Sequence, residues 1–209
     1  MALHDVGILG TGHMGQGLAL AWAAAGHRVT LGSRDAAAAR ARLPAATASR
    51  LACGHYADAA ARDVVVLATP FAATAELVGR HAGLLAGKVI VDITNPFGAA
   101  PAGMPGIAVH AAALGRPARW VAAFKTNFWC TIAAVDGRAR PCLLAADDAA
   151  AKAVAADLAR AAGFAPEDCG GLQHALTLDL LVPLMIEMDG QRGATHRSYW
   201  QFVAGTTPG

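Results

Sequence analysis

The sequence predicts an α/β protein built on a doubly wound parallel sheet, with a small C-terminal α/β portion packed on that sheet. Strand-like and helix-like segments alternate through the N-terminal part of the chain, with short links between them. Two of the strand-like segments, Asp63–Ala68 and Lys88–Ile93, are almost continuous apolar runs, which is typical of strands buried on both faces of a parallel sheet. A glycine-rich turn, Gly10–Gly15, joins the first strand to the first helix.

The N-terminal part supplies the sheet. Its first helix is rich in alanine and leucine and closes at Gly26, and its second helix stops before Pro44, which cannot continue a helix. The pattern of Ala45–Tyr56 fits neither element, so no third strand is assigned there, and Thr94–Pro105 is a loop rich in glycine and proline. The expected strands are Val6–Leu9, Arg28–Leu31, Asp63–Ala68, Lys88–Ile93 and Trp120–Phe124, and the expected helices are Met14–Ala25, Ala36–Arg42, Ala72–His81 and Ile107–Leu114.

The pattern changes after about residue 130. No linker interrupts the chain there, so residues 1–130 are expected to form the sheet domain and residues 131–209 a portion packed on it that is not an independent domain. The tail, 196–203, gathers aromatic side chains for which burial is favourable. The elements expected in this part are the strand Pro141–Ala145, the helix Asp147–Ala162, the extended segment Gly163–Pro166 and the helix Gln173–Met188.

Composition excludes several classes of protein. The 209 residues have a mean hydropathy of +0.39, but much of it comes from alanine, and the most apolar stretch, Leu176–Ile186, is too short for a bilayer span and contains Asp179 and Pro183. The net charge of +2, without a cluster of basic residues, argues against nucleic acid as a partner. Four scattered cysteines show no metal-ligand spacing, which predicts free thiols, no metal and a reducing, cytoplasmic location.

The glycine-rich turn carries the pattern GxGxxG. It follows a strand and opens a helix, the context in which this pattern predicts a dinucleotide site. The first glycine allows the tight turn, the second lets the backbone approach a pyrophosphate, and the third lets helix and strand pack closely. The free N–H groups and positive dipole of the helix N-terminus favour the anion. His13 either contacts the cofactor or faces solvent. The predicted binding residues here are Gly10, Thr11, Gly12, His13, Met14 and Gly15.

The end of the second strand predicts which dinucleotide is bound. An NAD site usually carries an acidic residue there to hold the ribose 2′-hydroxyl, whereas this chain has Ser33 and Arg34. A guanidinium can fork onto the oxygens of a 2′-phosphate, and a serine hydroxyl can donate one more hydrogen bond. Asp35 is better explained as the cap of the next helix. The sequence therefore predicts NADP rather than NAD.

Polar and aromatic residues follow three further strands. Because ligands bind at the carboxyl ends of parallel strands, these residues are expected to face the same crevice, although threonine, asparagine and proline also serve ordinary turns. Both interpretations can hold together. The aromatic residues Phe71, Phe97, Phe128 and Trp129 would suit a flat substrate, and core packing is the alternative for each. The cofactor-binding residues predicted here are Thr69, Pro70, Phe71, Asn95, Pro96, Thr126 and Asn127.

Five segments together resemble a known family. They are GILGTGHMGQGLALAWAAAGHRVTLGSRD, VVVLATPF, KVIVDITNPFG, AFKTNFW and CGGLQHALTLDLLVPLMIEM, in this order. They are similar to the NADPH-dependent reductases of the coenzyme F420:NADP oxidoreductase type, and also to the cytosolic reductase domain of six-transmembrane metalloreductases. The Ser33–Arg34 pair is the more specific element.

The resemblance implies a Rossmann-type sheet, a homodimer, and hydride transfer between NADP(H) and a flat co-substrate such as coenzyme F420, FMN or FAD. The nicotinamide would lie near Thr126–Trp129 and Asn95–Pro96. Direct hydride transfer depends on alignment more than on an acid or base, so no catalytic side chain is predicted.

The chain departs from this family at several positions. Lys125 stands where relatives tend to carry asparagine or histidine, and Ala38 replaces a basic residue near the 2′-phosphate site, with Arg40 as a substitute. A proline common before the long C-terminal helix is absent. These departures leave the identity of the second substrate open.

Two other functions are compatible with the glycine pattern, and each makes a further demand on the sequence. β-Hydroxyacid dehydrogenases and imine reductases share the glycine pattern but need a long helical C-terminal domain, for which the residues after the sheet leave no room. An NADPH-binding sensor or scaffold without turnover would have no reason to keep an aromatic cleft beside the nicotinamide. His110 and His174 lie among apolar residues and are expected to be packed histidines rather than ligands.

Overall fold

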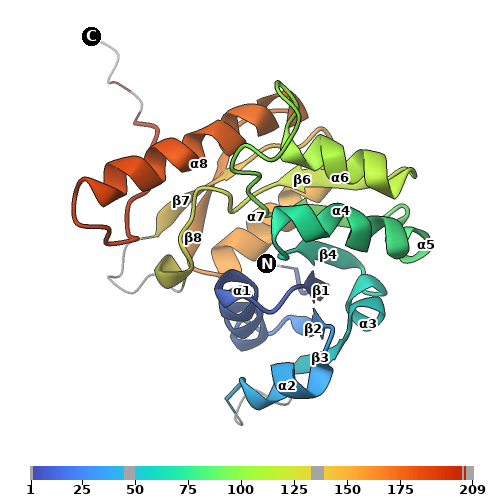
Figure 1. Ribbon diagram of the computed structural model, residues 1–209. Helices are drawn as coiled ribbons and strands as arrows, with labels where there is room; N and C mark the ends of the chain where they lie inside the picture. Colours follow the sequence, from blue (N-terminus) through green and yellow to red (C-terminus); the bar gives the residue numbers. More distant parts are fainter. Residues whose placement is uncertain (1, 45–49, 133–138, 204, 206–209) are drawn as a thin grey trace.

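The computed structural model describes residues 2–44, 50–132, 139–203 and 205. Six parallel strands form one sheet in the order β3-β2-β1-β4-β5-β6, and helices cover both of its faces (Figure 1). The order reverses between β1 and β4, which is the position of the ligand crevice in doubly wound sheets. The strands are β1 (Asp5–Leu9), β2 (Arg28–Ser33), β3 (Leu51–His55), β4 (Val64–Leu67), β5 (Val89–Asp92) and β6 (Arg119–Ala122).

Each face of the sheet has its own hydrophobic core. One core joins Val6, Ile8 and Val66 to Trp22 and other apolar side chains of α1 and α7. The second core joins the opposite side chains of β4 and β5 to α3, α4, α5, α6 and α8. The helices are α1 (His13–Ala24), α2 (Ala36–Ala41), α3 (Tyr56–Ala60), α4 (Phe71–Arg80), α5 (Ala82–Leu85), α6 (Gly106–Leu114), α7 (Ala149–Ala161) and α8 (Ala175–Gly190).

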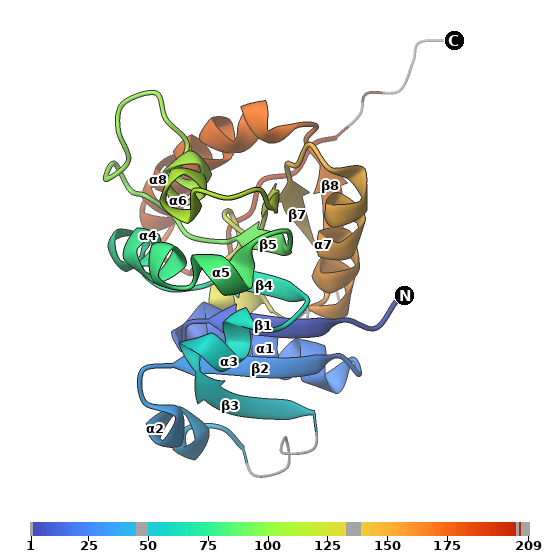
Figure 2. The same ribbon diagram turned by 90° about the vertical axis from the view of Figure 1, so that its right-hand side faces the viewer.

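The C-terminal part packs directly on the sheet. Two parallel strands, β7 (Arg140–Leu144) and β8 (Phe164–Asp168), flank α7, and Figure 2 shows this unit beside the main sheet. Ala145 and Ala122 exchange two backbone hydrogen bonds of 2.9 and 3.0 Å, so the chain after β7 continues the sheet from β6. This arrangement confirms the predicted α/β portion packed on a doubly wound sheet. None of the helices in the described part of the chain has the length and hydrophobicity that a bilayer crossing requires.

The expected elements lie within about two residues of the observed ones, except near β3. This strand is an edge strand on which only Leu51 is buried, so its side chains carry no apolar alternation. The short helices α3 and α5 were also missed. Part of the unassigned segment, residues 45–49, lies outside the described residues.

The burial expected for the tail is wrong in part. Phe202 and Val203 are 81% and 74% exposed. The segment is held instead by Asp189, whose carboxylate accepts hydrogen bonds from the Ser198 hydroxyl and, at 2.8 Å, from the His196 backbone N–H. These hydrogen bonds lower the pKa of Asp189 to about 2.

Candidate functional site

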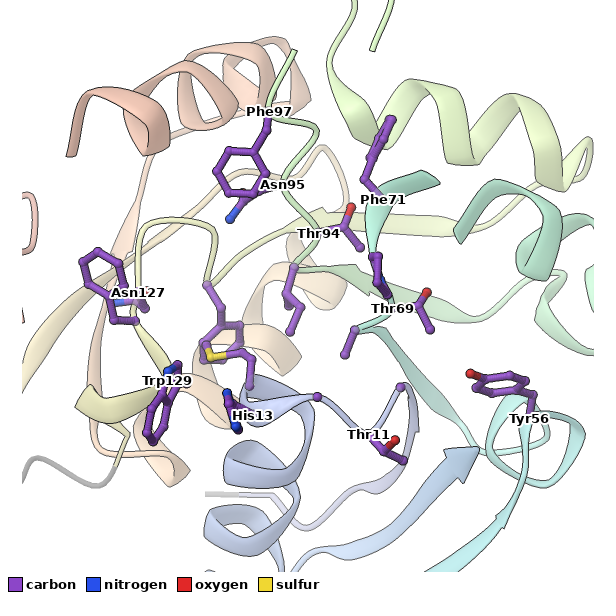
Figure 3. A pocket seen from close by; sticks show the side chains of 18 of the residues that line it. Thr11, His13, Tyr56, Thr69, Phe71, Thr94, Asn95, Phe97, Asn127 and Trp129 are labelled. Atoms are coloured by element: carbon purple, nitrogen blue, oxygen red, sulfur yellow. The ribbon is translucent and has the colours of Figure 1, made fainter. Parts of the chain in front are cut away.

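A pocket of about 500 Å³ opens where the carboxyl ends of β1, β4 and β5 meet the chain that follows β6. Figure 3 shows its two ends, with Thr11 and Tyr56 at one and Asn127 and Trp129 at the other. Its lining residues are Gly10, Thr11, Gly12, His13, Met14, Arg34, Tyr56, Ala68, Thr69, Pro70, Phe71, Ile93, Thr94, Asn95, Phe97, Phe124, Asn127, Phe128 and Trp129.

The glycine turn has the geometry that an anion site needs. Gly10 has a φ of 133°, and a Cβ there would lie 2.3 Å from the Ala68 carbonyl oxygen, so no other residue fits. A Cβ at Gly15 would lie 2.5 Å from the Gly10 carbonyl oxygen, which explains the third glycine. At Gly12 a Cβ would meet nothing within 4 Å, which leaves open space beside the start of α1. No side chain caps this helix, so its first N–H groups are free to bind a phosphate.

The end of the pocket beside β2 carries an exposed cation. Arg34 lines the pocket, is exposed, and has no ion-pair or hydrogen-bond partner among the residues that the structure describes. Ser33 lies just outside the lining, and its Oγ accepts a hydrogen bond of 3.1 Å from the Asp35 N–H, which leaves its own proton available. Asp35 caps α2 through Ala38, as predicted. Arg40, expected as a substitute cation, donates to the Leu51 carbonyl oxygen at 3.3 Å.

Aromatic side chains line the other end. The His13 and Trp129 rings lie 4.8 Å apart, so His13 lies in the pocket and bridges the glycine turn to the chain after β6. Phe97 and Trp129 are 61% and 51% exposed. Phe97 and Phe124 have φ values of 47° and 55°, a strained backbone for residues with a Cβ. Such strain concentrates at binding sites because the surrounding structure holds it in place.

Two amide side chains at this end are held in one orientation. Asn95 donates its Nδ2 to the Lys125 carbonyl oxygen at 3.0 Å, and Asn127 donates its Nδ2 to the Pro141 carbonyl oxygen at 2.9 Å. A flipped amide would place oxygen against oxygen in either case. The Oδ1 atoms of both residues are buried and have no hydrogen-bond partner among the residues that the structure describes.

A buried network of polar side chains holds the loop after β5 that lines the aromatic end of the pocket. Thr94 is almost completely buried: its N–H and hydroxyl donate to Asp92 Oδ1 at 2.9 and 2.8 Å, and its carbonyl oxygen accepts from Lys125 Nζ at 2.6 Å. His110 is hydrogen-bonded to the other Asp92 oxygen at 2.7 Å. Burial alone would raise the pKa of Asp92, but the Lys125 ammonium and the His110 hydrogen bond outweigh it and hold the pKa below its usual value.

Lys125 connects this network to the C-terminal helix. Its ammonium lies 2.8 Å from Asp179 Oδ1 in α8, and Asp179 Oδ2 accepts the Gly106 N–H, at the start of α6, at 2.7 Å. Both side chains are almost completely buried. Lys125 is therefore turned away from the pocket and does not line it.

Most of the predicted cofactor-binding residues line this pocket, but four do not. Pro96 and Thr126 are buried behind it, Gly15 packs inside α1, and Ser33 lies at its edge. Tyr56 was missed because it follows the unassigned strand β3, and Thr94 was assigned only to a loop rich in glycine and proline. His110 is a packed histidine as expected, whereas His174 is exposed. The described residues hold no cluster of three or more metal-ligating side chains.

Comparison with known proteins agrees with this geometry. The family described as NADP oxidoreductase, coenzyme F420-dependent, matches residues 5–96. The chain is 32% identical over 203 residues to the F420-dependent NADP reductase of Methanothermobacter marburgensis, an alignment that covers 86% of this chain and 89% of the relative. A candidate F420-dependent NADP-reductase from Arthrobacter sp. FB24 has a crystal structure with a TM-score of 0.80 and 31% identity, covering 96% of this chain and 100% of that one.

A rival family shares only the fold. An imine reductase variant from Myxococcus stipitatus gives a TM-score of 0.65 at 23% identity, and the match covers 93% of this chain but 64% of that one. The uncapped N-terminus of α1, the open space at Gly12 and the exposed Arg34 in the pocket lining fit a phosphorylated dinucleotide. Because it is 32% identical to the reductase of M. marburgensis over most of both chains, this chain belongs to the family of coenzyme F420-dependent NADP oxidoreductases.

Proposed function

We propose that this protein transfers a hydride between NADP(H) and a flat deazaflavin or flavin, of which coenzyme F420, FMN and FAD are the candidates. The observation that carries the proposal is the continuity of one pocket from the glycine turn and Arg34 to the rings of Phe97, Phe128 and Trp129. A dinucleotide extended along this pocket would place its nicotinamide among aromatic side chains, where a second flat ring can stack.

In this proposal, residues along the pocket bind successive parts of NADP(H). The N-terminus of α1 binds the pyrophosphate, and Arg34 with Ser33 binds the 2′-phosphate. Thr69, Pro70 and Phe71 border the middle of the pocket, and the Thr69 hydroxyl is already paired with Thr74 at 2.8 Å. Bound NADPH supplies the hydride, and the chain contributes alignment and exclusion of water rather than a proton donor.

A stopped-flow panel tests this function. NADPH is mixed with the protein and with FMN, FAD or coenzyme F420 in turn, and oxidation of NADPH is followed by absorbance. We expect rapid turnover with one of the three acceptors. Tight binding of NADPH without turnover of any acceptor would favour the alternative, an NADPH-binding sensor or scaffold.

We also propose that the protein is a cytoplasmic homodimer. Two apolar side chains one turn apart on α8, Leu180 and Leu184, are 64% and 48% exposed, and a second copy would cover them. All four cysteines are free thiols, which supports a reducing compartment.

A further inference from the structure

The C-terminal segment 194–198 is tied to the end of α8 by one carboxylate. Asp189 Oδ2 accepts the His196 N–H at 2.8 Å. Asp189 Oδ1 accepts the Thr195 hydroxyl at 3.0 Å and also the Ser198 hydroxyl. Asp189 is the residue before the last of α8, a place where the helix dipole disfavours a negative charge. The donors of the tail therefore stabilise this carboxylate, and the carboxylate in turn holds the tail.

The same segment contacts the chain that follows β6. The His196 imidazole lies 5.2 Å from the Phe128 ring, measured between ring centroids, and its Nδ1 lies 3.5 Å from Asp189 Oδ2. The His196 carbonyl oxygen accepts a hydrogen bond from Cys130 Sγ at 2.8 Å. His196 has a φ of 53°, a conformation that needs such contacts to hold it. It thus joins α8 to residues 128–130 through both its side chain and its backbone.

Phe128 and Trp129 form one wall of the pocket at its aromatic end. Locally this wall is held by the 3₁₀ turn Trp129–Thr131. A 3₁₀ turn has poorer hydrogen-bond geometry than an α-helix, so contacts from outside decide how firmly the wall is held. Rings from distant parts of the chain supply such contacts: His13 lies 4.8 Å from Trp129, and His196 lies against Phe128.

We propose that the segment 194–198 is a strap that fixes this wall, and that His196 is a positioning residue for the hydride acceptor. The inference rests on the proposed function, in which a flat acceptor stacks among the aromatic side chains at this end. A ring that stacks on a loose wall samples more poses, and a smaller fraction of them is aligned for hydride transfer. His196 acts through Phe128, because His196 is not among the residues that line the pocket.

Hydrogen exchange followed by mass spectrometry tests the strap without any substrate. His196→Asn removes the ring, and asparagine tolerates the positive φ at this position. We expect the backbone amides of residues 129–131 to exchange about 2- to 10-fold faster, the effect of losing one aromatic contact. Asp189→Asn replaces one accepting oxygen by an amide group that donates, so it should give an increase in the same range.

Steady-state kinetics test the positioning role. With the acceptor that the stopped-flow panel identifies, His196→Asn should lower kcat/KM for the acceptor about 2- to 10-fold. The preference for NADPH over NADH should not change, because the proposed 2′-phosphate site lies at the opposite end of the pocket. His196→Phe should restore kcat/KM to within about twofold, since it returns a ring. Phe97 and Phe124 already adopt a similar positive φ in this chain.

His174→Asn is the matched control, because His174 is an exposed histidine at the opposite end of α8. It should change neither the exchange rates nor the kinetics. Unchanged exchange in both His196→Asn and Asp189→Asn would overturn the strap. Faster exchange with unchanged acceptor kinetics would overturn the positioning role. Absence of turnover in the unaltered protein would overturn the proposed function itself, and the exchange rates would still decide whether the strap holds the wall.

Discussion

At the residue scale, the guanidinium of Arg34 lies in the pocket without an ion-pair partner among the described residues. A 2′-phosphate would supply the missing anion. We expect Arg34→Ala to weaken NADPH binding by about 1.5–3 kcal/mol, the contribution of a charge-assisted hydrogen bond, and to leave NADH binding nearly unchanged. Fluorescence titration with both dinucleotides measures this difference.

Arg40 provides the matched control for this prediction. It is the arginine of the neighbouring helix α2, but it donates to the backbone of β3 at Leu51. Arg40→Ala should therefore preserve the preference for NADPH over NADH. If Arg34→Ala weakened the binding of both dinucleotides equally, the 2′-phosphate assignment would be wrong.

At the scale of elements, the pair of Lys125 and Asp179 joins four segments. It connects the end of β6 and the loop after β5 to α8, and through Gly106 to α6. Lys125→Met would leave the Asp179 carboxylate buried without a counter-ion. We expect a loss of about 3–5 kcal/mol in the free energy of unfolding, measured by urea denaturation.

The double variant Lys125→Met/Asp179→Asn tests whether the unpaired Asp179 carboxylate causes this loss of stability. An asparagine at position 179 removes the buried charge and keeps an oxygen that can accept the Gly106 N–H, so much of the stability should return. A loss below about 1 kcal/mol in Lys125→Met would mean that the ion pair is not needed to hold these elements together.

At the scale of the whole molecule, α8 presents exposed apolar side chains, Leu180 and Leu184, to its surroundings. We expect light scattering to give twice the chain mass of 21.2 kDa. Leu180→Glu/Leu184→Glu should yield a monomer, because burying two carboxylates in an apolar contact is unfavourable. Leu84→Glu, at a 40% exposed leucine of α5, should remain a dimer. A monomer in the unaltered protein would contradict the proposed assembly.

Buried strands and glycine turns were the features most readily predicted from sequence. The apolar runs of β4 and β5 reflect burial on both faces, and the glycines of the turn before α1 reflect close contacts that a Cβ would prevent. Edge strand β3 was not predictable, because a strand with one buried residue leaves no periodic signal. Tyr56 was lost with it, although it lines the pocket.

The sequence alone determined five of the six strands of the sheet, the glycine turn before α1 and the Ser33–Arg34 pair, because each of these depends on residues close together in the chain. Only the tertiary structure decided how distant residues meet. It turned Lys125 away from the pocket toward Asp179, placed Tyr56 in the lining of the pocket, and left Oδ1 of Asn95 and of Asn127 without partners in the described part of the chain. Local patterns record backbone conformation and burial, whereas the direction of a buried polar side chain depends on partners that folding alone brings within reach.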